Sequence, residues 1–331
     1  MSRFTQFGNS LYTGERSFDF VGNRIRWYLI GGVLVVLAIA ITLLRGGFSF
    51  GIEFSGGSEF RVSNPAAVVE QTAIDTVESE AGLESNPRVS IVGGDSVRVQ
   101  TEQLTDEQTT QLRQDLADAY AVPLESVTAS FVGATWGQDI TRQALIGLLV
   151  FLVLVSFVMA LYFRTWKMSI AALTALAHDL LITAGVYGVL GYEITPAAVI
   201  GFLTILGYSL YDTVVVFDKV RENTSQDGEE SSRTFAESVN LAVNQTLVRS
   251  INTSVVAVLP VGSILFIGSL LLGAGTLRDI ALALFIGMIA GTYSSIFIAA
   301  PLYVHLRESE PEYKKQGRKA REPRPASGAV R

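Results

Sequence analysis

Six long apolar stretches divide this 331-residue chain, and they constrain its fold more than any other feature. A bilayer core of about 30 Å needs about 20 apolar residues in a helix that rises about 1.5 Å per residue. The sequence therefore predicts an α-helical polytopic membrane protein, with one span, a polar segment and then five spans. The predicted spans are Trp27–Leu44, Ala144–Phe163, Met168–Leu190, Pro196–Phe217, Ile251–Leu272 and Ile280–Val304.

Basic residues indicate the orientation, because Lys and Arg concentrate in cytoplasmic loops. The segment between the first two spans, Phe48–Gln138, holds four Arg, no Lys and fourteen Asp or Glu. We therefore expect that segment outside the cytoplasmic (inner) membrane and both termini in the cytoplasm. The first span lacks a small-residue cleavage site, so it is expected to remain as an anchor. The basic residues on the other side are Arg3, Arg16, Arg24, Arg26, Arg164, Lys167, Lys219, Arg221, Arg233, Arg307, Lys314, Lys315, Arg318, Lys319, Arg321 and Arg324.

The polar segment after the first span has the pattern of a small α+β domain. Helices are predicted over Ala66–Ala81 and from a capping box at Thr105 and Gln108 to Tyr120. The order β-α-β-β-α-β is typical of a ferredoxin-like split βαβ fold, which hosts many functions and argues for none. Alternating residues predict strands at Ser58–Ser63, Arg88–Val92, Ser96–Thr101 and Ser126–Val132, with a hairpin turn at Gly93, Gly94 and Asp95.

The composition argues against an enzyme and against a nucleic-acid partner. There is no Cys, and the two His residues, His178 and His305, lie far apart in sequence. The carboxylates form no cluster with metal-ligand spacing, so no metal or cofactor is expected. The run FGIEFSGGSEF (Phe50–Phe60) lacks the G-x-G-x-x-G spacing of a nucleotide loop and is interpreted as a turn where the chain leaves the membrane. No basic patch interleaved with aromatic residues occurs.

The strongest candidate for function is Asp212, a carboxylate inside the fourth span. An ionisable side chain at this depth costs about 2.5–3.5 kcal/mol on insertion scales, so it is read first as functional. Arg249 enters the fifth span from the same side and is expected at a similar depth. Arg249 would favour ionised Asp212 and desolvation would favour the neutral acid, as in a proton-responsive site. A static ion pair, or Arg249 snorkelling to lipid phosphates, stays open.

Other polar residues in the spans have less defined roles. Asp179 lies near mid-membrane, where a proton-path role and a structural hydrogen bond are equally open. Its neighbour His178 points about 100° away on a helix and is expected to be structural. Gly287 and Gly291 form a G-x-x-x-G pair that predicts helix contact. The residues expected to support the polar interior are Tyr211, Thr213, Asn252 and Thr253.

Four segments in order are similar to the SecF family of protein-export membrane proteins, within the RND superfamily. They are FGIEFSGG, HDLLIT (His178–Thr183), GYSLYDTVVVFDKVREN (Gly207–Asn223) and NQTLVRSINTS (Asn244–Ser254). The resemblance implies a subunit that uses the proton-motive force to promote late-stage export. It implies a SecD-like subunit, the SecYEG translocon and exported unfolded polypeptides as partners. It also places Asp212 and Arg249 at the coupling site, with Tyr211 where some relatives have Asn.

These patterns divide the chain into five parts. They are 1–25 (cytoplasmic), 26–45 (first span), 46–138 (extracytoplasmic domain), 139–304 (five-helix bundle) and 305–331 (a basic, disordered tail that attracts membrane lipids). A proton-coupled RND-type permease for a small molecule or lipid is an alternative, although such permeases usually carry a second large outward loop. A structural scaffold of the translocon is a further alternative, and it predicts that Asp212 is dispensable.

Overall fold

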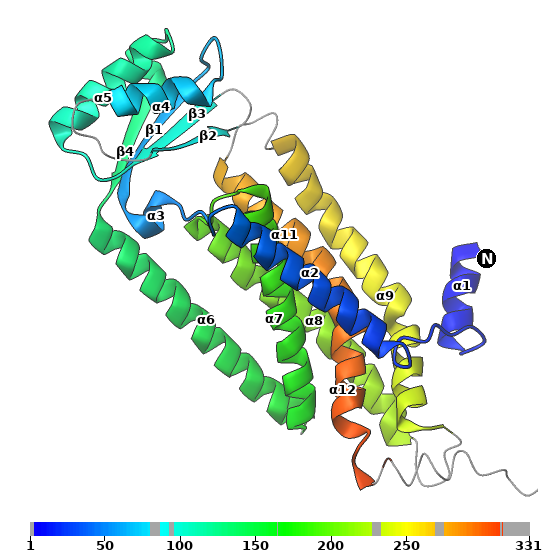
Figure 1. Ribbon diagram of the computed structural model, residues 1–331. Helices are drawn as coiled ribbons and strands as arrows, with labels where there is room; N and C mark the ends of the chain where they lie inside the picture. Colours follow the sequence, from blue (N-terminus) through cyan, green and yellow to red (C-terminus); the bar gives the residue numbers. More distant parts are fainter. Residues whose placement is uncertain are drawn as a thin grey trace, which may run out of the picture.

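The computed structural model of the chain combines a helical bundle with a small α/β domain at one end (Figure 1). It describes residues 3–79, 87–92, 96–163, 165–226, 233–268, 275–311 and 313. Within those ranges, six helical segments are long and apolar enough to cross a membrane, as predicted. They are α2 (Arg24–Leu44), α6 (Ala134–Phe163), α7 (Trp166–Leu190), α8 (Pro196–Gln226), α9 (Phe235–Ser263) with the π-helical η2 (Ile264–Gly268), and α11 (Gly275–Ser294) with η3 (Ser295–Ala299, also π-helical) and α12 (Ala300–Arg307).

Some helices begin well before the predicted spans. α9 begins at Phe235, after a capping box in which Thr234 and Glu237 satisfy each other's backbone N–H groups. Its first turns are amphipathic and bury Val239 and Val243, so hydropathy alone does not mark them as helix. α6 likewise begins at Ala134, and α8 continues to Gln226.

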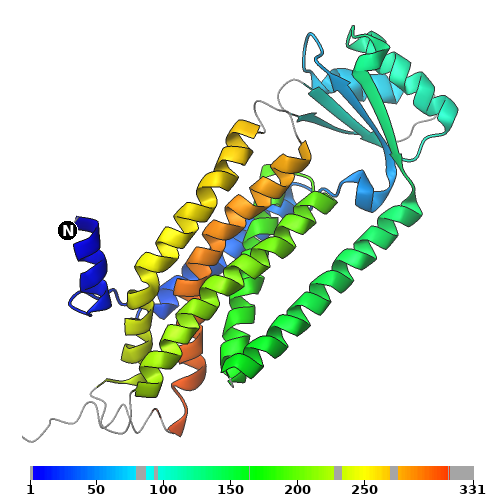
Figure 2. The ribbon, with the colours of Figure 1, turned by 180° about the vertical axis from the view of Figure 1, so that it is seen from behind.

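Small residues let the helices of the bundle approach closely. A Cβ atom at Gly287 would lie 2.2 Å from Ile205 Cγ1 on α8, so only glycine fits there. One turn later, a Cβ atom at Gly291 would lie 2.9 Å from the Cβ of Ser209. The prediction of a helix contact at this G-x-x-x-G pair is therefore confirmed. Seen from behind, α8, α9 and α11 run side by side along the bundle, whereas α6 diverges from them toward the α/β domain and packs against α7 and α8 near Phe163 (Figure 2).

The α/β domain is inserted between α2 and α6. Its elements are α3 (Ile52–Ser55), β1 (Gly57–Ser63), α4 (Glu70–Ser79), β2 (Arg88–Val92), β3 (Ser96–Thr101), α5 (Asp106–Ala119), the 3-10 turn η1 (Leu124–Ser126) and β4 (Val127–Val132). The short helix α3 leads into a four-stranded antiparallel sheet with the order β2-β3-β1-β4, the topology predicted for a ferredoxin-like domain. The helices α4 and α5 cover one face of the sheet (Figure 1), where Phe60, Val99 and Leu116 are buried.

One helix of this domain begins later than predicted, and one predicted turn lies outside the described residues. α4 begins at Glu70 rather than Ala66, and the Tyr120 hydroxyl donates to the carbonyl of Val69, the residue before the helix. The capping box at Thr105 and Gln108 is confirmed. The predicted hairpin turn at residues 93–95 lies outside the described residues, although the strands that it joins are paired.

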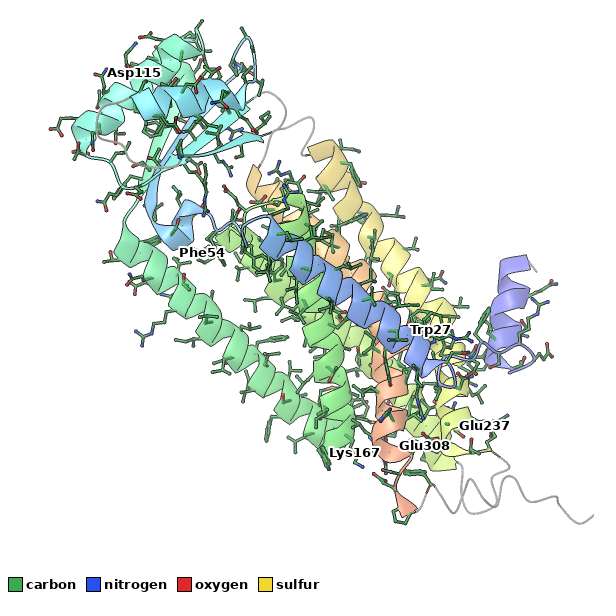
Figure 3. The ribbon with its side chains drawn as sticks, viewed as in Figure 1. Trp27, Phe54, Asp115, Lys167, Glu237 and Glu308 are labelled. Carbon is green, nitrogen blue, oxygen red and sulfur yellow. The ribbon has the colours of Figure 1, made fainter. Side chains whose placement is uncertain are left out.

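The opposite end of the bundle holds the first and last described helices. Figure 3 places Lys167 and Glu308 there, far from Asp115 in the α/β domain. Lys167 Nζ lies 2.7 Å from Glu310 Oε1, and Arg24 pairs with Glu308 at 2.7 Å. The prediction of a disordered tail from residue 305 was therefore wrong for its first residues, which complete α12 and these ion pairs. Residues 312 and 314–331 lie outside the described ranges. At the other terminus, α1 (Arg3–Tyr12) packs beside α9.

Candidate functional site

Two carboxylates are buried in the middle of the bundle. Asp179 on α7 is 0 % exposed and Asp212 on α8 is 5 % exposed. A carboxylate in an apolar interior requires hydrogen-bond donors or a cation, since its desolvation is otherwise too costly. The donors that each carboxylate has therefore define what the site can do.

Asp212 is held by two serine hydroxyls from two other helical segments. Ser250 of α9 donates to Oδ1 at 2.8 Å, and Ser295 of η3 donates to Oδ2 at 2.6 Å. Both serines are fully buried. Asp212 thus joins α8 to α9 and to the last span through hydroxyl groups alone.

Asp179 has an analogous environment one helix away. Its Oδ2 atom accepts hydrogen bonds from Ser209 of α8 at 2.5 Å and from Ser294 of α11 at 2.8 Å. His178 Nδ1 lies 3.3 Å from Oδ1, so the two neighbours touch each other although their positions on the helix point about 100° apart. Rotation about the side-chain bonds closes the separation that their positions on the helix impose. His178 Nε2 is buried and has no hydrogen-bond partner in the described part of the chain.

A change of helix type separates the two serines of the last span. The π-helical segment η3 starts at Ser295, directly after Ser294 ends α11. Pro301 follows in α12 and has no N–H for the carbonyl four residues earlier, so a regular helix could not continue unchanged. Consecutive helical residues point about 100° apart, which lets Ser294 and Ser295 reach different carboxylates. Such π turns occur often at functional sites.

The predicted ion pair between Asp212 and Arg249 does not form. Arg249 is exposed, and its Nη2 atom lies 3.4 Å from the hydroxyl of Tyr211, which is itself 56 % exposed. The predicted similarity in depth is correct, because Ser250, the residue after Arg249, contacts Asp212. The expectation that the Arg249 side chain faces Asp212 was wrong, because Ser250 faces the carboxylate and Arg249 points outward from α9.

The predicted supporting residues mostly lie elsewhere. Tyr211 and Asn252 are exposed on the outside of the bundle, and Thr253 is half-buried. Thr213 is buried, but its hydroxyl donates to the carbonyl of Ser209 within α8. Four serines that bind the carboxylates were not predicted: Ser209, Ser250, Ser294 and Ser295. Their available signal was weak, because serines inside apolar spans also serve simply to pack helices.

The groups around the two carboxylates determine what chemistry the site allows. No group of three His, Asp or Glu side chains that could hold a metal occurs within the described ranges. A hydroxyl can donate or accept a hydrogen bond, so it can accompany a carboxylate in either protonation state.

Fold and site together define a class: a polytopic, RND-like membrane protein whose bundle buries carboxylates beneath an inserted α/β domain. Residues 112–309 match the family described as "Protein export membrane protein SecD/SecF, C-terminal". The chain belongs to this family, which confirms the resemblance found in the sequence.

Individual relatives agree with this assignment. The protein translocase subunit SecF of Streptomyces coelicolor is 46 % identical over 315 residues, which cover 95 % of this chain and 83 % of that relative. The crystal structure of SecDF, a translocon-associated membrane protein from Thermus thermophilus, superposes with a TM-score of 0.77 at 32 % identity. The match covers 88 % of this chain and 39 % of that one. A crystal structure of SecDF in a super-membrane-facing form superposes with a TM-score of 0.62 at 31 % identity. This second match covers 92 % of this chain and 40 % of that one.

Proposed function

We propose that this chain is a SecF-like subunit of the Sec protein-export machinery and that it uses the proton-motive force, with a SecD-like partner, to promote late-stage translocation. The membership of a family of protein translocase subunits supports the export role. The observation that carries the proton coupling is Asp212, buried among apolar spans and bound by hydroxyls in place of a cation. Asp179 is a second, less certain coupling group.

The hydrogen bonds around Asp212 support a reversible proton site. Ser295 Oγ lies 2.6 Å from the carboxylate and 3.2 Å from the carbonyl oxygen of Thr292. When Asp212 is ionised, the Ser295 hydroxyl donates to it. When Asp212 is protonated, the acid can donate to Ser295, whose own hydrogen then turns to Thr292. Neither state leaves the Asp212 carboxyl group or the Ser295 hydroxyl without a hydrogen-bond partner.

Arg249 enters this mechanism through its position next to Ser250. Consecutive residues are about 100° apart around a helix, so a rotation of α9 about its axis would exchange Ser250 for Arg249 opposite Asp212. We propose that Ser250 accompanies neutral Asp212 and that Arg249 approaches the ionised form. A proton would then bias the bundle between two arrangements, limited by their difference in free energy.

The charge pattern and the family support the proposed orientation and partners. The basic loops support a cytoplasmic location of both termini and a location of the α/β domain outside the cytoplasmic membrane. This chain covers 39 % of the SecDF chain, which supports a SecD-like subunit as the missing part. SecYEG and exported unfolded polypeptides complete the proposed assembly. The α/β domain would bind the emerging polypeptide, and membrane lipids would surround the bundle.

The test compares the same substitution at two positions of α8. Asp212→Asn keeps the size of the side chain and removes its charge, so the protein should insert and co-purify with a SecD-like partner but lose most proton-driven export. Asp218→Asn is the matched control, since Asp218 is exposed on the same helix. Arg249→Met should resemble Asp212→Asn. Normal export by both Asp212→Asn and Arg249→Met, under conditions where the control requires the proton gradient, would refute the coupling role.

A further inference from the structure

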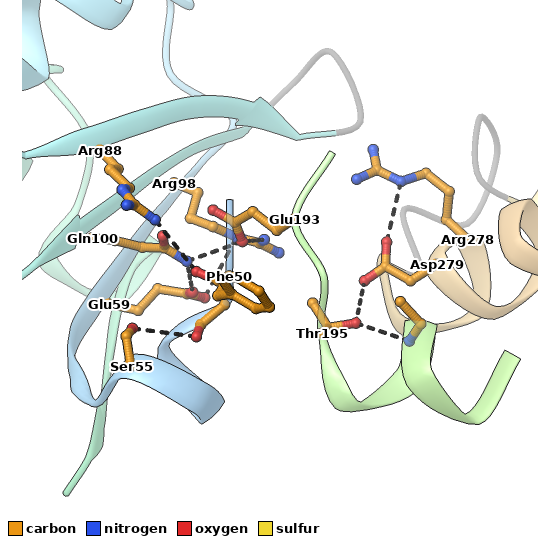
Figure 4. A network of polar contacts seen from close by, with 12 residues as sticks. Phe50, Ser55, Glu59, Arg88, Arg98, Gln100, Glu193, Thr195, Arg278 and Asp279 are labelled. Carbon is orange, nitrogen blue, oxygen red and sulfur yellow. Dashed lines mark hydrogen bonds and ion pairs between the residues drawn. The ribbon is translucent and has the colours of Figure 1, made fainter. Parts of the chain in front are cut away.

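A compact polar cluster joins the α/β domain to the bundle at the connection between α7 and α8 (Figure 4). We call Glu59, Arg98, Gln100 and Glu193 the junction cluster. Glu193 Oε2 lies 3.1 Å from Arg98 Nη1 and 3.1 Å from Gln100 Nε2. Glu59 closes the cluster, with Oε2 3.0 Å from Gln100 Nε2 and Oε1 3.5 Å from Arg98 Nε. Its charged members are at most 20 % exposed, so water screens these contacts less than it would at an open surface.

The sheet presents the cluster because successive strand residues point to opposite faces. Val97 and Val99 of β3 are buried beneath α4 and α5, whereas Arg98 and Gln100 point to the other face. That second face meets the connection that carries Glu193. The α/β domain therefore rests on the bundle through side chains of its open sheet face.

The backbone reinforces this contact on the adjacent residue. Ile194 N–H donates to the carbonyl of Ser49 at 2.8 Å, and its carbonyl accepts from Gly51 N–H at 3.1 Å. These two bonds form a parallel bridge between Phe50 and Ile194. The segment between α2 and α3 is thus paired with the α7–α8 connection.

The connection leads directly into the helix of the buried carboxylate. Thr195 Oγ1 accepts a hydrogen bond from the N–H of Ala198 in the first turn of α8 and donates to Asp279 Oδ2 of α11 at 3.0 Å. Asp212 lies 17 residues further along α8, about 26 Å at the rise of a regular helix. A displacement of the connection therefore moves the start of α8, the helix that carries Asp212, relative to α11. Serines of these two helices, Ser209 and Ser294, hold Asp179.

We propose that Glu193 and Arg98 are positioning residues that couple the placement of the α/β domain to α8 and thereby to the site at Asp212. The inference rests on the proposed function, because it gives the coupling between bundle and domain a physical path. Glu193 does not touch the proton site. It acts by holding the domain to the helix that carries that site.

The sequence offers a matched pair of variants. Arg61 and Arg98 face each other across β1 and β3, on the same face of the sheet. Arg98 Nη1 binds Glu193, whereas Arg61 forms no ion pair within the described ranges; the Nε atoms of both arginines are buried without a hydrogen-bond partner there. Arg98→Met and Arg61→Met therefore remove the same group from neighbouring positions, and only the first breaks the junction. Glu193→Ala breaks it from the bundle side.

The placement of the domain can be measured directly in the full-length protein. The chain has no Cys, so spin labels can be attached at Glu107→Cys on α5 and Leu259→Cys on α9, both exposed. Arg98→Met and Glu193→Ala should broaden the distance distribution between the labels, and Arg61→Met should not. The same variants without labels are assayed for proton-driven export. We expect a loss of about five- to tenfold for Arg98→Met and Glu193→Ala, in the range usual for coupled sites, and none for Arg61→Met.

Two results would overturn the proposal. One is a distance distribution that stays unchanged in both junction variants. The other is a broadened distribution with normal export, which would make the cluster an anchor without a coupling role. Asp212→Asn is measured in parallel: normal export by that variant refutes proton coupling at Asp212, while the distance measurement still decides whether the junction holds the domain.

Discussion

Ser294 and Ser295 are consecutive in the chain, yet their hydroxyls bind two different buried carboxylates. Ser294 Oγ donates to Asp179 at 2.8 Å and Ser295 Oγ donates to Asp212 at 2.6 Å. The last span therefore links α7 and α8 through two adjacent residues. A small rotation of this segment would change the environments of both carboxylates together.

The first prediction concerns the hydrogen bond from Ser295 to Asp212. Ser295→Ala leaves a buried acceptor short of one donor, which costs about 1–3 kcal/mol. We expect a lower unfolding temperature in detergent and reduced proton-driven export. Ser263→Ala is the control, because Ser263 is exposed and donates only to the carbonyl of Leu259 in its own helix. Equal export by the two variants would exclude a role of Ser295 in coupling.

The second prediction tests the close contact between α8 and α11. Gly287→Ala places a methyl group against Ile205, and such overpacking costs about 1–3 kcal/mol. Gly207→Ala on α8 is the matched control, because no atom lies within 4 Å of the added Cβ. Thermal unfolding in detergent should show destabilisation only for Gly287→Ala. A Gly287→Ala protein as stable as the control would mean that the helices can separate at little cost.

The third prediction is a pH dependence at the junction cluster. Burial raises the pKa of Glu193 above its ordinary value, and the Arg98 charge offsets this only in part. The folded protein then binds a proton at a pH where the unfolded chain has released it, so stability falls as pH rises through that window. Wild type should lose stability relative to Glu193→Gln as pH increases from about 4 through the raised pKa. Denaturant titrations at several pH values measure this difference, and a constant difference would contradict the prediction.

The fourth prediction concerns orientation. Thr128 on β4 and Ser225 near the end of α8 are both exposed. Because the chain has no Cys, single cysteines at these positions give an unambiguous labelling pattern. A membrane-impermeant thiol reagent should label Thr128→Cys in intact cells and should label Ser225→Cys only after the membrane is permeabilised. The reverse pattern would overturn the orientation derived from the basic loops.

Local signals in the sequence sufficed for the architecture. Apolar length marks the spans because a bilayer leaves no other way to satisfy a backbone, and alternation with turn residues marks the strands around the capping box at Thr105. The length of the apolar stretch did not reveal the first turns of α9, because an amphipathic helix has a low average hydropathy. Asp212 was also evident from sequence, because the cost of a charge in an apolar span requires no knowledge of its neighbours.

The sequence by itself thus determined the six spans, the inserted α/β domain, the family and the buried acid at Asp212. The tertiary structure decided which side chains meet that acid. Arg249 and Ser250 are adjacent in sequence, and only the rotation of α9 against α8 determines that Ser250 faces Asp212. The pairing of Glu193 with Arg98 was equally hidden, because it joins residues 95 positions apart through the packing of a sheet on a helical bundle. Such contacts depend on the relative placement of whole elements, which no local pattern of residues encodes.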